Sequence, residues 1–359
     1  MTNYKILVIN PGSTSTKIAI YENEVEKFKE TIDHPAEELA KYSTVMDQYQ
    51  MRKDSILSIL NNNGYKVGDL AAVVGRGGLL PPVKSGAYQV NDSMIARLKN
   101  KPIAEHASNL AAAIALDIAN DIEVNAYIYD AVAVDELEDH ARISGMPVIK
   151  RESLIHALNM RAAALKSCEK HDLDYPNTNL IVAHLGGGIS LSVHSGGKMI
   201  DIVSDDEGPF SPERAGRVPC KQLINLCYSG KYDKNTMKKM LRGKGGLVAY
   251  LGTVDAREVE AKIEAGDKEA EQVYYAMATQ VAKGIGELAT VVNGDVSRII
   301  ITGGIAYSKL MTEWISEKVK FIAPVEILPG ENELESLALG TLRVLKGEEK
   351  AYTYVDAEF

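Results

Sequence analysis

Cysteine is scarce in this 359-residue chain, and the few cysteines show no pattern. Cys168, Cys220 and Cys227 are odd in number, and no two of them form a CxxC pair. In a long chain this argues against a disulfide framework and against a zinc site. We therefore expect three buried, reduced thiols.

Long apolar segments and basic clusters are missing as well. No charge-free apolar run approaches the roughly 18 residues of a membrane span, and no basic segment leads into an apolar stretch near the N-terminus. Acidic residues outnumber basic residues 49 to 40, which repels nucleic acid and anionic lipid. The sequence predicts a soluble, cytoplasmic protein that binds neither membranes nor nucleic acid.

A strand–turn–strand unit occurs twice in the chain. Residues 4–10, 16–21 and 24–32 are predicted strands around the hydroxyl-rich turn PGSTST, and residues 179–184, 189–194 and 198–204 repeat the pattern around Leu-Gly-Gly-Gly. Two copies half a chain apart indicate a duplicated fold, although two hairpins can also resemble each other by chance. The alternation of strands with helices predicts a mixed α/β architecture.

The remaining elements and the domain limits follow from the same pattern. Helices are expected at residues 105–120, 153–168, 219–229, 255–264 and 267–292, and further strands at 125–136 and from 298. Pro147 and the charged segment IKRES suggest a crossing between domains. We expect one domain at residues 1–150, joined by a C-terminal helix at 338–359, and a second domain at 151–337.

Three glycine-rich turns have a composition suited to binding phosphate. PGSTST, HLGGGIS and ITGGIA each follow an apolar strand, and backbone N–H groups can converge there because no side chain blocks them. The first turn lacks GxxxxGK[ST] and is not a Walker loop. Each turn alone also fits an ordinary hairpin or strand-to-helix turn. Together they match a nucleotide held between two duplicated domains.

Nine segments, in order and across almost the whole chain, resemble the acetate and butyrate kinases: VINPGSTSTK, GRGG, EHASN, YDAVAVDE, SLIHALN, HLGGGIS, EGPFSPER, ITGGIA and ENELESLALG. GRGG and EGPFSPER are similar to the butyrate kinase branch. The resemblance implies the fold of the superfamily of actin, sugar kinases and heat-shock chaperone ATPases. That fold has two duplicated, ribonuclease H-like domains with a nucleotide cleft between them. The N-terminal domain would serve the acyl and phosphoryl groups, and the C-terminal domain the nucleotide.

The resemblance implies reversible transfer of the ATP γ-phosphoryl group to the carboxylate of a short-chain fatty acid, giving an acyl phosphate and ADP, with Mg²⁺. Butyrate is the first expectation, with acetate, propionate or isobutyrate as alternatives. A non-catalytic nucleotide-binding protein is the alternative of another class. A carboxylate is ionised at pH 7 and needs no general base, so direct in-line transfer governed by electrostatics is expected. A homodimer or higher homo-oligomer is also implied.

The resemblance carries roles to individual residues. The catalytic residues would be Asn10, Arg76, Asp130, His156 and Arg214, with Arg217 as a competitor of Arg214. Asn10, Asp130 and Glu333 would serve the metal, with Glu331 as the alternative because Asn332 stands at the glutamate of the family motif. Phosphate contacts would come from Ser13, Ser15, Lys17, His184, Gly186, Gly187 and Gly188, and the adenosine turn would be Gly303, Gly304 and Ile305.

The acyl pocket is implied to include His106, Ile155 and Pro212. Ile155 stands where acetate kinases have phenylalanine, and the smaller side chain leaves space for a longer acyl group. Glu105 falls where an apolar neighbour of the pocket is expected, and Gly187 replaces the asparagine of HLGNG. The adenosine segment also differs, because GGIAYS replaces AGIGEN.

Overall fold

The computed structural model describes residues 2–356 and divides the chain into two compact units. The first unit joins the chain up to Asp135 with the segment from Asn332 onward, and the second is Glu136–Glu331. These divisions differ from the expected limits at 150 and 337. Residues 136–150 lie in the second unit because their contacts are there: Glu136 accepts the Met199 N–H at 3.1 Å, and the Glu138 N–H donates to the Ile200 carbonyl at 3.0 Å.

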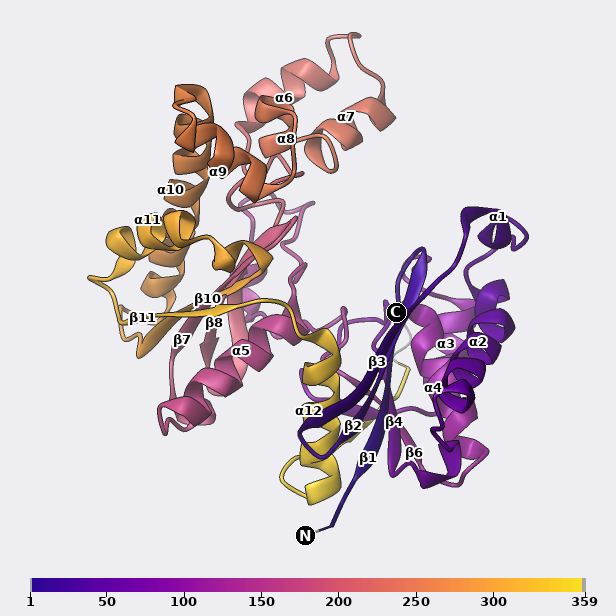
Figure 1. Ribbon diagram of the computed structural model, residues 1–359. Helices are drawn as coiled ribbons and strands as arrows, with labels where there is room; N and C mark the ends of the chain where they lie inside the picture. The colour runs from indigo at the N-terminus through magenta and orange to yellow at the C-terminus, as the bar shows by residue number, and fades with distance from the viewer. Residues whose placement is uncertain (1, 357–359) are drawn as a thin grey trace. The chain divides into compact units, whose positions relative to one another are not determined.

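The first unit is built on a seven-stranded sheet (Figure 1). Its order is β12-β5-β6-β4-β1-β2-β3, with the bounds β1 Lys5–Pro11, β2 Ser15–Glu22, β3 Val25–Asp33, β4 Ala72–Arg76, β5 Ala87–Gln89, β6 Asn125–Tyr129 and β12 Tyr352–Thr353. The first three strands form the predicted antiparallel meander. Strand β4 runs parallel to β1, and β6 runs parallel to β4.

Helices cover both sides of this sheet. Figure 1 shows helices α4 (Asn109–Asn120) and α12 (Glu333–Lys346) on opposite sides of the sheet. The first unit also contains α1 Ala36–Leu39, α2 Tyr49–Asn62 and α3 Asp92–Asn100. A Cβ on Gly75 would lie 2.7 Å from the Ala111 carbonyl oxygen, and one on Gly340 would lie 2.6 Å from the Tyr129 ring. Both helices therefore approach the sheet at positions that admit only glycine.

The second unit repeats this strand pairing. Its five-stranded sheet has the order β11-β10-β7-β8-β9, with the bounds β7 Leu180–Leu185, β8 Ile189–Ser195, β9 Lys198–Val203, β10 Arg298–Gly303 and β11 Val325–Pro329. Strands β7, β8 and β9 form an antiparallel meander, β10 is parallel to β7, and β11 is parallel to β10. The same order and directions occur in β1, β2, β3, β4 and β6, so the predicted duplication is confirmed.

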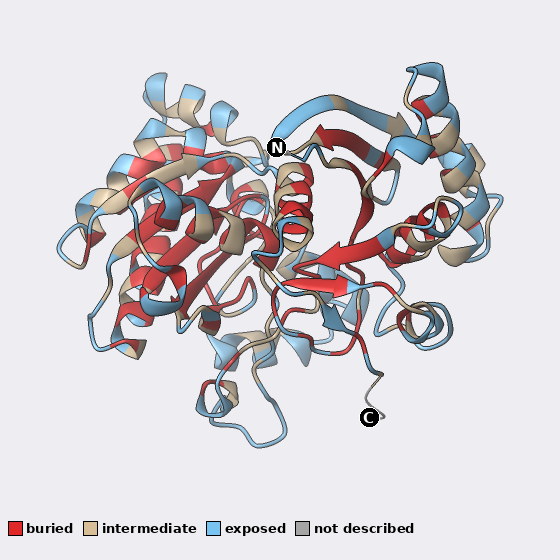
Figure 2. Cartoon of the chain, turned by 90° about the horizontal axis from the view of Figure 1, so that it is seen from below, coloured by how far each residue is buried: buried red, intermediate tan, exposed pale blue. Residues whose placement is uncertain are grey.

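Alternate residues of the second sheet face two different helices. Ile181, Ala183 and Leu185 lie in one apolar cluster with α10, Lys268–Val291, while Leu180 and Val182 lie in another with α5, Ala157–Lys170. A period of two places these sets on opposite faces of the sheet. Both faces of β7 are covered, and every residue of this strand is buried, the class drawn in red in Figure 2.

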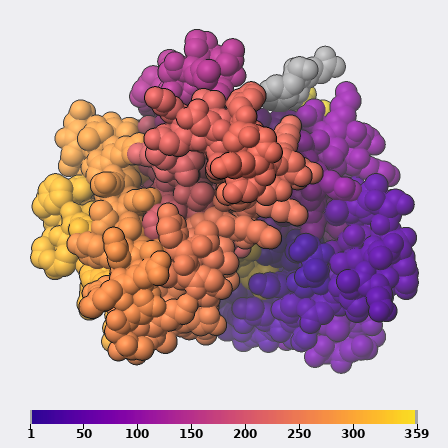
Figure 3. Space-filling model, turned by 90° about the horizontal axis from the view of Figure 1, so that it is seen from above, coloured from indigo at the N-terminus to yellow at the C-terminus, as the bar shows by residue number. Residues whose placement is uncertain are grey.

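The other helices of the second unit are α6 Cys220–Cys227, α7 Lys234–Leu241, α8 Leu247–Leu251, α9 Ala256–Glu264 and α11 Lys309–Val319. Figure 3 shows the side chains of α6 and α7 at the surface, in salmon. No residue of α6 is buried, so Cys220 and Cys227 are exposed. The expectation of buried thiols is therefore wrong for these two residues, and only Cys168 is buried. Among residues 2–356, no helix is both long and apolar enough to cross a bilayer.

Four predicted elements are shorter than expected. The C-terminal helix predicted at 338–359 corresponds to α12, which begins earlier, at Glu333, and ends at Lys346, because Gly347 follows with a φ of +76°; residues 357–359 lie outside the described residues. The helix predicted from residue 105 begins at Asn109, after turns in which the His106 Nδ1 lies 2.7 Å from the Ser108 hydroxyl. The strand predicted at 125–136 ends at Tyr129, because Asp130 has a φ of +39° and leaves the extended region. The helix predicted from 153 begins at Ala157.

Candidate active-site residues in the two units

Three candidate residues of the first unit lie at one edge of its sheet. Asn10 is the penultimate residue of β1, Arg76 ends β4, and Asp130 directly follows β6. These strands are parallel neighbours, so their carboxyl ends meet at the same edge. Ligands of α/β proteins bind at that edge.

Glu333, at the start of α12, connects these residues. The Asn10 Nδ2 donates to the Glu333 carboxylate at 2.7 Å, and the Arg76 Nε lies 3.7 Å from its other oxygen. The Arg76 Nη1 donates to the Asp130 carbonyl at 2.9 Å. The structure therefore joins Asn10, Arg76, Asp130 and Glu333 in one cluster. Glu331, the alternative to Glu333, instead lies against His184 in the second unit.

The backbone of Asp130 is held in its unusual conformation by Gly86. The Asp130 N–H donates to the Gly86 carbonyl at 3.1 Å, and the Gly86 N–H donates to the Asp130 carboxylate at 2.7 Å.

Burial lowers the pKa of Arg76, while the carboxylates of Glu333 and Asp130 oppose that shift. Burial also lowers the pKa of His106, and the positive charge of Arg76 adds to the effect.

The hydroxyl-rich turn between β1 and β2 presents its side chains outward. Ser13 is exposed and Ser15 is half-buried. Lys17 is exposed and lies directly opposite Asn10 in the strand pair, which places both side chains on one face. Arg52 of α2 lies beneath the turn and bonds its backbone. Sequence reasoning missed Arg52, because an arginine within a helix is ordinarily exposed.

Two histidines are stacked in the second unit, beside the turn between β7 and β8. The ring centroids of His156 and His184 are 4.2 Å apart, with an angle of 24° between the rings. The His156 Nδ1 lies 2.9 Å from the Ser190 hydroxyl, and the His184 Nε2 lies 3.0 Å from the Glu331 carboxylate. These contacts fix the orientation of both rings at the glycine turn.

The glycine turn, Gly186–Gly188, has a different neighbour at each position. A Cβ on Gly186 would lie 3.0 Å from the Glu331 carboxylate, and one on Gly188 would lie 2.5 Å from the Arg214 guanidinium carbon. The Gly187 carbonyl accepts the Ser211 hydroxyl at 2.6 Å, and a Cβ there would meet only Glu213, at 3.5 Å. Arg214 therefore lies directly against this turn.

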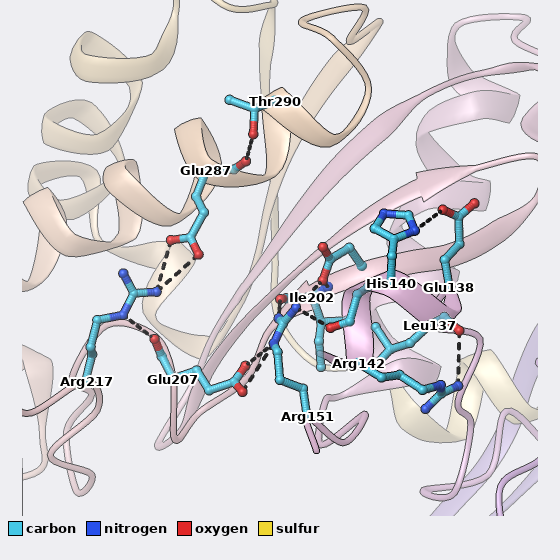
Figure 4. Close-up of polar contacts among 12 residues, drawn as sticks. Leu137, Glu138, His140, Arg142, Arg151, Ile202, Glu207, Arg217, Glu287 and Thr290 are labelled. Atoms are coloured by element: carbon cyan, nitrogen blue, oxygen red, sulfur yellow. Dashed lines mark hydrogen bonds and ion pairs between the residues drawn. The ribbon is translucent and has the colours of Figure 1, made fainter. Parts of the chain in front are cut away.

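Arg217, the competitor of Arg214, lies elsewhere. Its Nε donates to the Glu207 carbonyl at 2.6 Å, and its Nη2 pairs with Glu287 of α10 at 3.0 Å (Figure 4). Its side chain is 57% exposed, against 16% for Arg214. The contact with Gly188 and the burial favour Arg214 as the arginine of the phosphate turn.

Asp205 holds Arg214 and was not identified from the sequence. Its carboxylate pairs with the Arg214 Nη1 and, at 2.9 Å, with Arg242 at the end of α7. Burial, together with the smaller effect of the positive charge of Arg242, lowers the pKa of Arg214 to about 10. No signal in the sequence connects these three residues, because α6 and α7 both lie between Arg214 and Arg242.

The turn expected to bind adenosine follows β10. Gly303 has a φ of +93° and exchanges two backbone hydrogen bonds with Gly330, at 3.0 and 3.3 Å. Gly304 is exposed, with no atom within 4 Å of an added Cβ. Ile305 follows in the same turn, and its side chain packs into the apolar core of the second unit.

The residues expected in the acyl pocket lie in both units. His106 is an exposed residue of the first unit, whereas Ile155 and Pro212 belong to the second. Ile155 is half-buried and packs against two apolar clusters, and Pro212 is buried. Glu105 has a local role, because its carboxylate accepts the Val45 N–H at 2.7 Å.

Comparison with known proteins identifies the family of the chain. The profile of the acetokinase family matches residues 161–339. Butyrate kinase 2 of Clostridium acetobutylicum is 50% identical over 353 residues, which cover 98% of this chain and 99% of that protein. The chain belongs to the acetokinase family. A probable butyrate kinase of Clostridium botulinum strain Alaska E43 is 49% identical over 354 residues, which cover 98% of this chain and 100% of that protein.

The fold is also that of the acetokinase family. The crystal structure of Porphyromonas gingivalis acetate kinase matches with a TM-score of 0.78 at 20% identity, covering 95% of this chain and 100% of that one. The predicted fold class, two duplicated actin-like ATPase domains, is therefore confirmed.

Proposed function

We propose that this member of the acetokinase family is a butyrate kinase, which transfers the γ-phosphoryl group of ATP reversibly to butyrate and forms butanoyl phosphate and ADP. The observation that carries the proposal is the 50% identity to butyrate kinase 2 of C. acetobutylicum over nearly the full length of both chains. The polar cluster of the first unit and the glycine turns of the second support it.

The chemistry requires positive charge more than it requires a base. The acceptor carboxylate is ionised at neutral pH, and the transition state spreads negative charge over the transferred phosphoryl oxygens. Arg76 is buried at the strand edge and its guanidinium is held by Asp130 and Glu333, so it is oriented before any substrate arrives. Electrostatic stabilisation by preorganised groups is usually the largest single contribution to catalysis.

The first unit also offers oxygen ligands of the kind Mg²⁺ prefers. Asn10 and Glu333 are in direct contact, and Asp130 is joined to them through Arg76. Amide and carboxylate oxygens fit magnesium, which would neutralise phosphate charge when bound. We propose Asn10, Asp130 and Glu333 as the residues that hold it, either directly or through water.

The second unit supplies the proposed nucleotide side. The N–H groups of Gly187, Gly188 and Gly304 lie at turns that follow buried strands, where backbone donors bind phosphate and ribose oxygens. The N–H groups of Gly186 and Gly303 instead donate to the carbonyls of Gly188 and Gly330 and hold the two turns in shape. His156 and Arg214 flank the first of these turns. We propose that they stabilise the negative charge on the phosphoryl group during direct in-line transfer.

Acyl preference is the finer part of the proposal. Butyrate is favoured over acetate, propionate and isobutyrate because the two relatives described above are named butyrate kinases, and because isoleucine at 155 is smaller than the phenylalanine of acetate kinases. One methylene in an apolar pocket is worth about 1–3 kcal/mol, so neighbouring acids should still react. We also propose a cytoplasmic enzyme that forms a homodimer or a higher homo-oligomer.

The test is acyl hydroxamate formation with ATP, Mg²⁺, hydroxylamine and acids from acetate to valerate, including isobutyrate. A maximum at butyrate is expected. A maximum at another acid would replace butyrate with that acid. If no acid gives a hydroxamate although ATP binds, the kinase proposal is overturned and a non-catalytic nucleotide-binding protein remains.

A further inference from the structure

Arg52 of α2 is completely buried beneath the turn that joins β1 to β2. Its Nη1 donates to the Gly12 carbonyl at 2.8 Å and to the Ser15 carbonyl at 3.1 Å, and its Nη2 donates to the Ser13 carbonyl at 3.1 Å. Three carbonyls of one short turn are therefore drawn toward a single guanidinium group.

The orientation of these carbonyls determines where the amides point. In a planar trans peptide the C=O and the following N–H point in opposite directions. Because the carbonyls of Gly12 and Ser13 face Arg52, the N–H groups of Ser13 and Thr14 face away from it. Ser13 and Thr14 are exposed, so these donors lie on the open side of the turn. Adjacent outward N–H groups form a binding site for an anion.

The charge of Arg52 is not matched by an acidic side chain. Gln48, one helical turn earlier, accepts from its Nε at 3.1 Å and from its Nη2 at 2.8 Å, and the Thr16 hydroxyl accepts from its Nη1 at 3.1 Å. No carboxylate within residues 2–356 lies at ion-pair distance from Arg52, and burial lowers its pKa. Buried arginines are ordinarily paired with acids, and this one bonds only neutral acceptors.

We propose that Arg52 is a positioning residue for the transferred phosphoryl group. It fixes the turn so that two N–H groups face the phosphoryl oxygens, and it holds an uncompensated positive charge directly behind them. The inference rests on the proposed function, because the anion it assigns to the turn is the terminal phosphate of ATP or the phosphate of butanoyl phosphate. Arg52 itself touches neither substrate.

Gln48→Glu separates the charge of Arg52 from its geometry. The new carboxylate keeps acceptor oxygens for both nitrogens that Gln48 now binds, so the turn should be retained while the positive charge is neutralised. Gln50→Glu is the matched control for charge, because it adds the same charge to the same helix at an exposed position. It replaces the bond from the Gln50 Nε2 to the Asp54 carboxylate with a solvent-exposed like-charge pair, which costs a few tenths of a kcal/mol in stability and does not touch Arg52. Arg52→Lys and Arg52→Met then compare retained charge with lost charge.

The readouts are KM and kcat for ATP, for butanoyl phosphate and for ADP, with thermal unfolding of each variant. We expect Gln48→Glu to raise KM for ATP and for butanoyl phosphate about tenfold, with little change for ADP, which lacks the transferred group. Gln50→Glu should behave as wild type, and Arg52→Lys should retain more activity than Arg52→Met.

Three results would overturn the inference. One is an active Gln48→Glu variant with wild-type KM values. Another is an equal rise of KM for ADP, which would show that the turn does not act specifically on the transferred phosphoryl group. The third is an equal loss of kinase activity in Arg52→Lys and Arg52→Met at equal thermal stability. It would mean that the charge of Arg52 does not matter and that the residue serves packing only. Absence of kinase activity in the wild type would instead overturn the proposed function.

Discussion

Gly188→Ala is a small change with a specific expected consequence. Gly188 does not have a positive φ, so alanine suits its backbone, but the added Cβ would lie 2.5 Å from the guanidinium carbon of Arg214. Atoms cannot remain that close, and the end of a long side chain moves more readily than a strand. The substitution should therefore displace the Arg214 guanidinium and leave the fold unchanged.

The size of the effect follows from what Arg214 is proposed to do. A hydrogen bond to a charged group is worth about 1.5–3 kcal/mol. Loss of that interaction with the phosphoryl group should lower kcat/KM for ATP roughly 10- to 150-fold. Gly187→Ala is the matched control, since a Cβ there would meet only Glu213 at 3.5 Å, an ordinary contact. It should change kcat/KM by less than about threefold.

The assay is steady-state kinetics of Gly188→Ala, Arg214→Met and the double variant. If the alanine acts through Arg214, it should have almost no further effect once the guanidinium is gone, so the two losses will not add. Fully additive losses, or a Gly188→Ala enzyme with wild-type kcat/KM, would refute this reasoning. Thermal unfolding of each variant separates lost chemistry from lost stability.

Three further predictions concern the second unit. His156→Ala should lower kcat about a hundredfold while the melting temperature stays near that of the wild type; wild-type turnover would remove the proposed role of the histidine. Gly303→Ala should lower the free energy of unfolding, measured by denaturant titration, by about 2–3 kcal/mol, because φ is +93° and the added Cβ would lie 2.7 Å from the Leu185 carbonyl carbon. Gly304→Ala is the control and should leave the free energy of unfolding unchanged, because no atom lies within 4 Å of its Cβ. His194 bonds Tyr175 and Ser192, and burial, aided by the charge of Arg161, lowers its pKa to about 3. It therefore stays neutral when folded, and stability should fall by about 1.4 kcal/mol per pH unit as the pH drops from about 6.5 toward about 3. His194→Gln should lose this slope, and an unchanged slope would exclude His194 as its source.

Sequence patterns predicted the two meanders because alternating apolar residues determine which strand faces are buried. The same reasoning missed α2, and the physical cause is Arg52. The buried positions of α2 are Arg52, Ile56 and Leu60, one on each successive turn. With arginine at the first of them, only two buried apolar residues remain to form the stripe by which a helix is recognised. A buried charge that bonds backbone carbonyls has no signature in hydrophobic periodicity.

Tertiary contacts distinguish between residues that the sequence left as alternatives for the same role. Glu331 and Glu333 are two residues apart in the same motif, yet one pairs with His184 and the other with Asn10, because Glu331 precedes α12 and Glu333 is its first residue. Arg214 and Arg217 are likewise close in sequence, and only Arg214 lies against Gly188. Side-chain direction at the end of an element depends on packing that a linear pattern does not contain.

The duplicated sheets carry different chemistry at equivalent positions. Asn10 and His184 are each the penultimate residue of the first strand, and Arg76 and Gly303 each end the next parallel strand. After the third parallel strand come Asp130 in the first unit and Gly330 in the second.

At two of these three positions, the first unit has a charged side chain where the second has glycine. Gly303 and Gly330 are joined by backbone hydrogen bonds. A Cβ on Gly303 would clash with the Leu185 backbone and would therefore disturb these bonds. Charged side chains can act on a reacting group, whereas bare backbone can approach and bind a nucleotide closely. This divergence within one topology supports the proposal that the strand ends of the first unit act on the phosphoryl group through side chains, and those of the second bind the nucleotide through backbone.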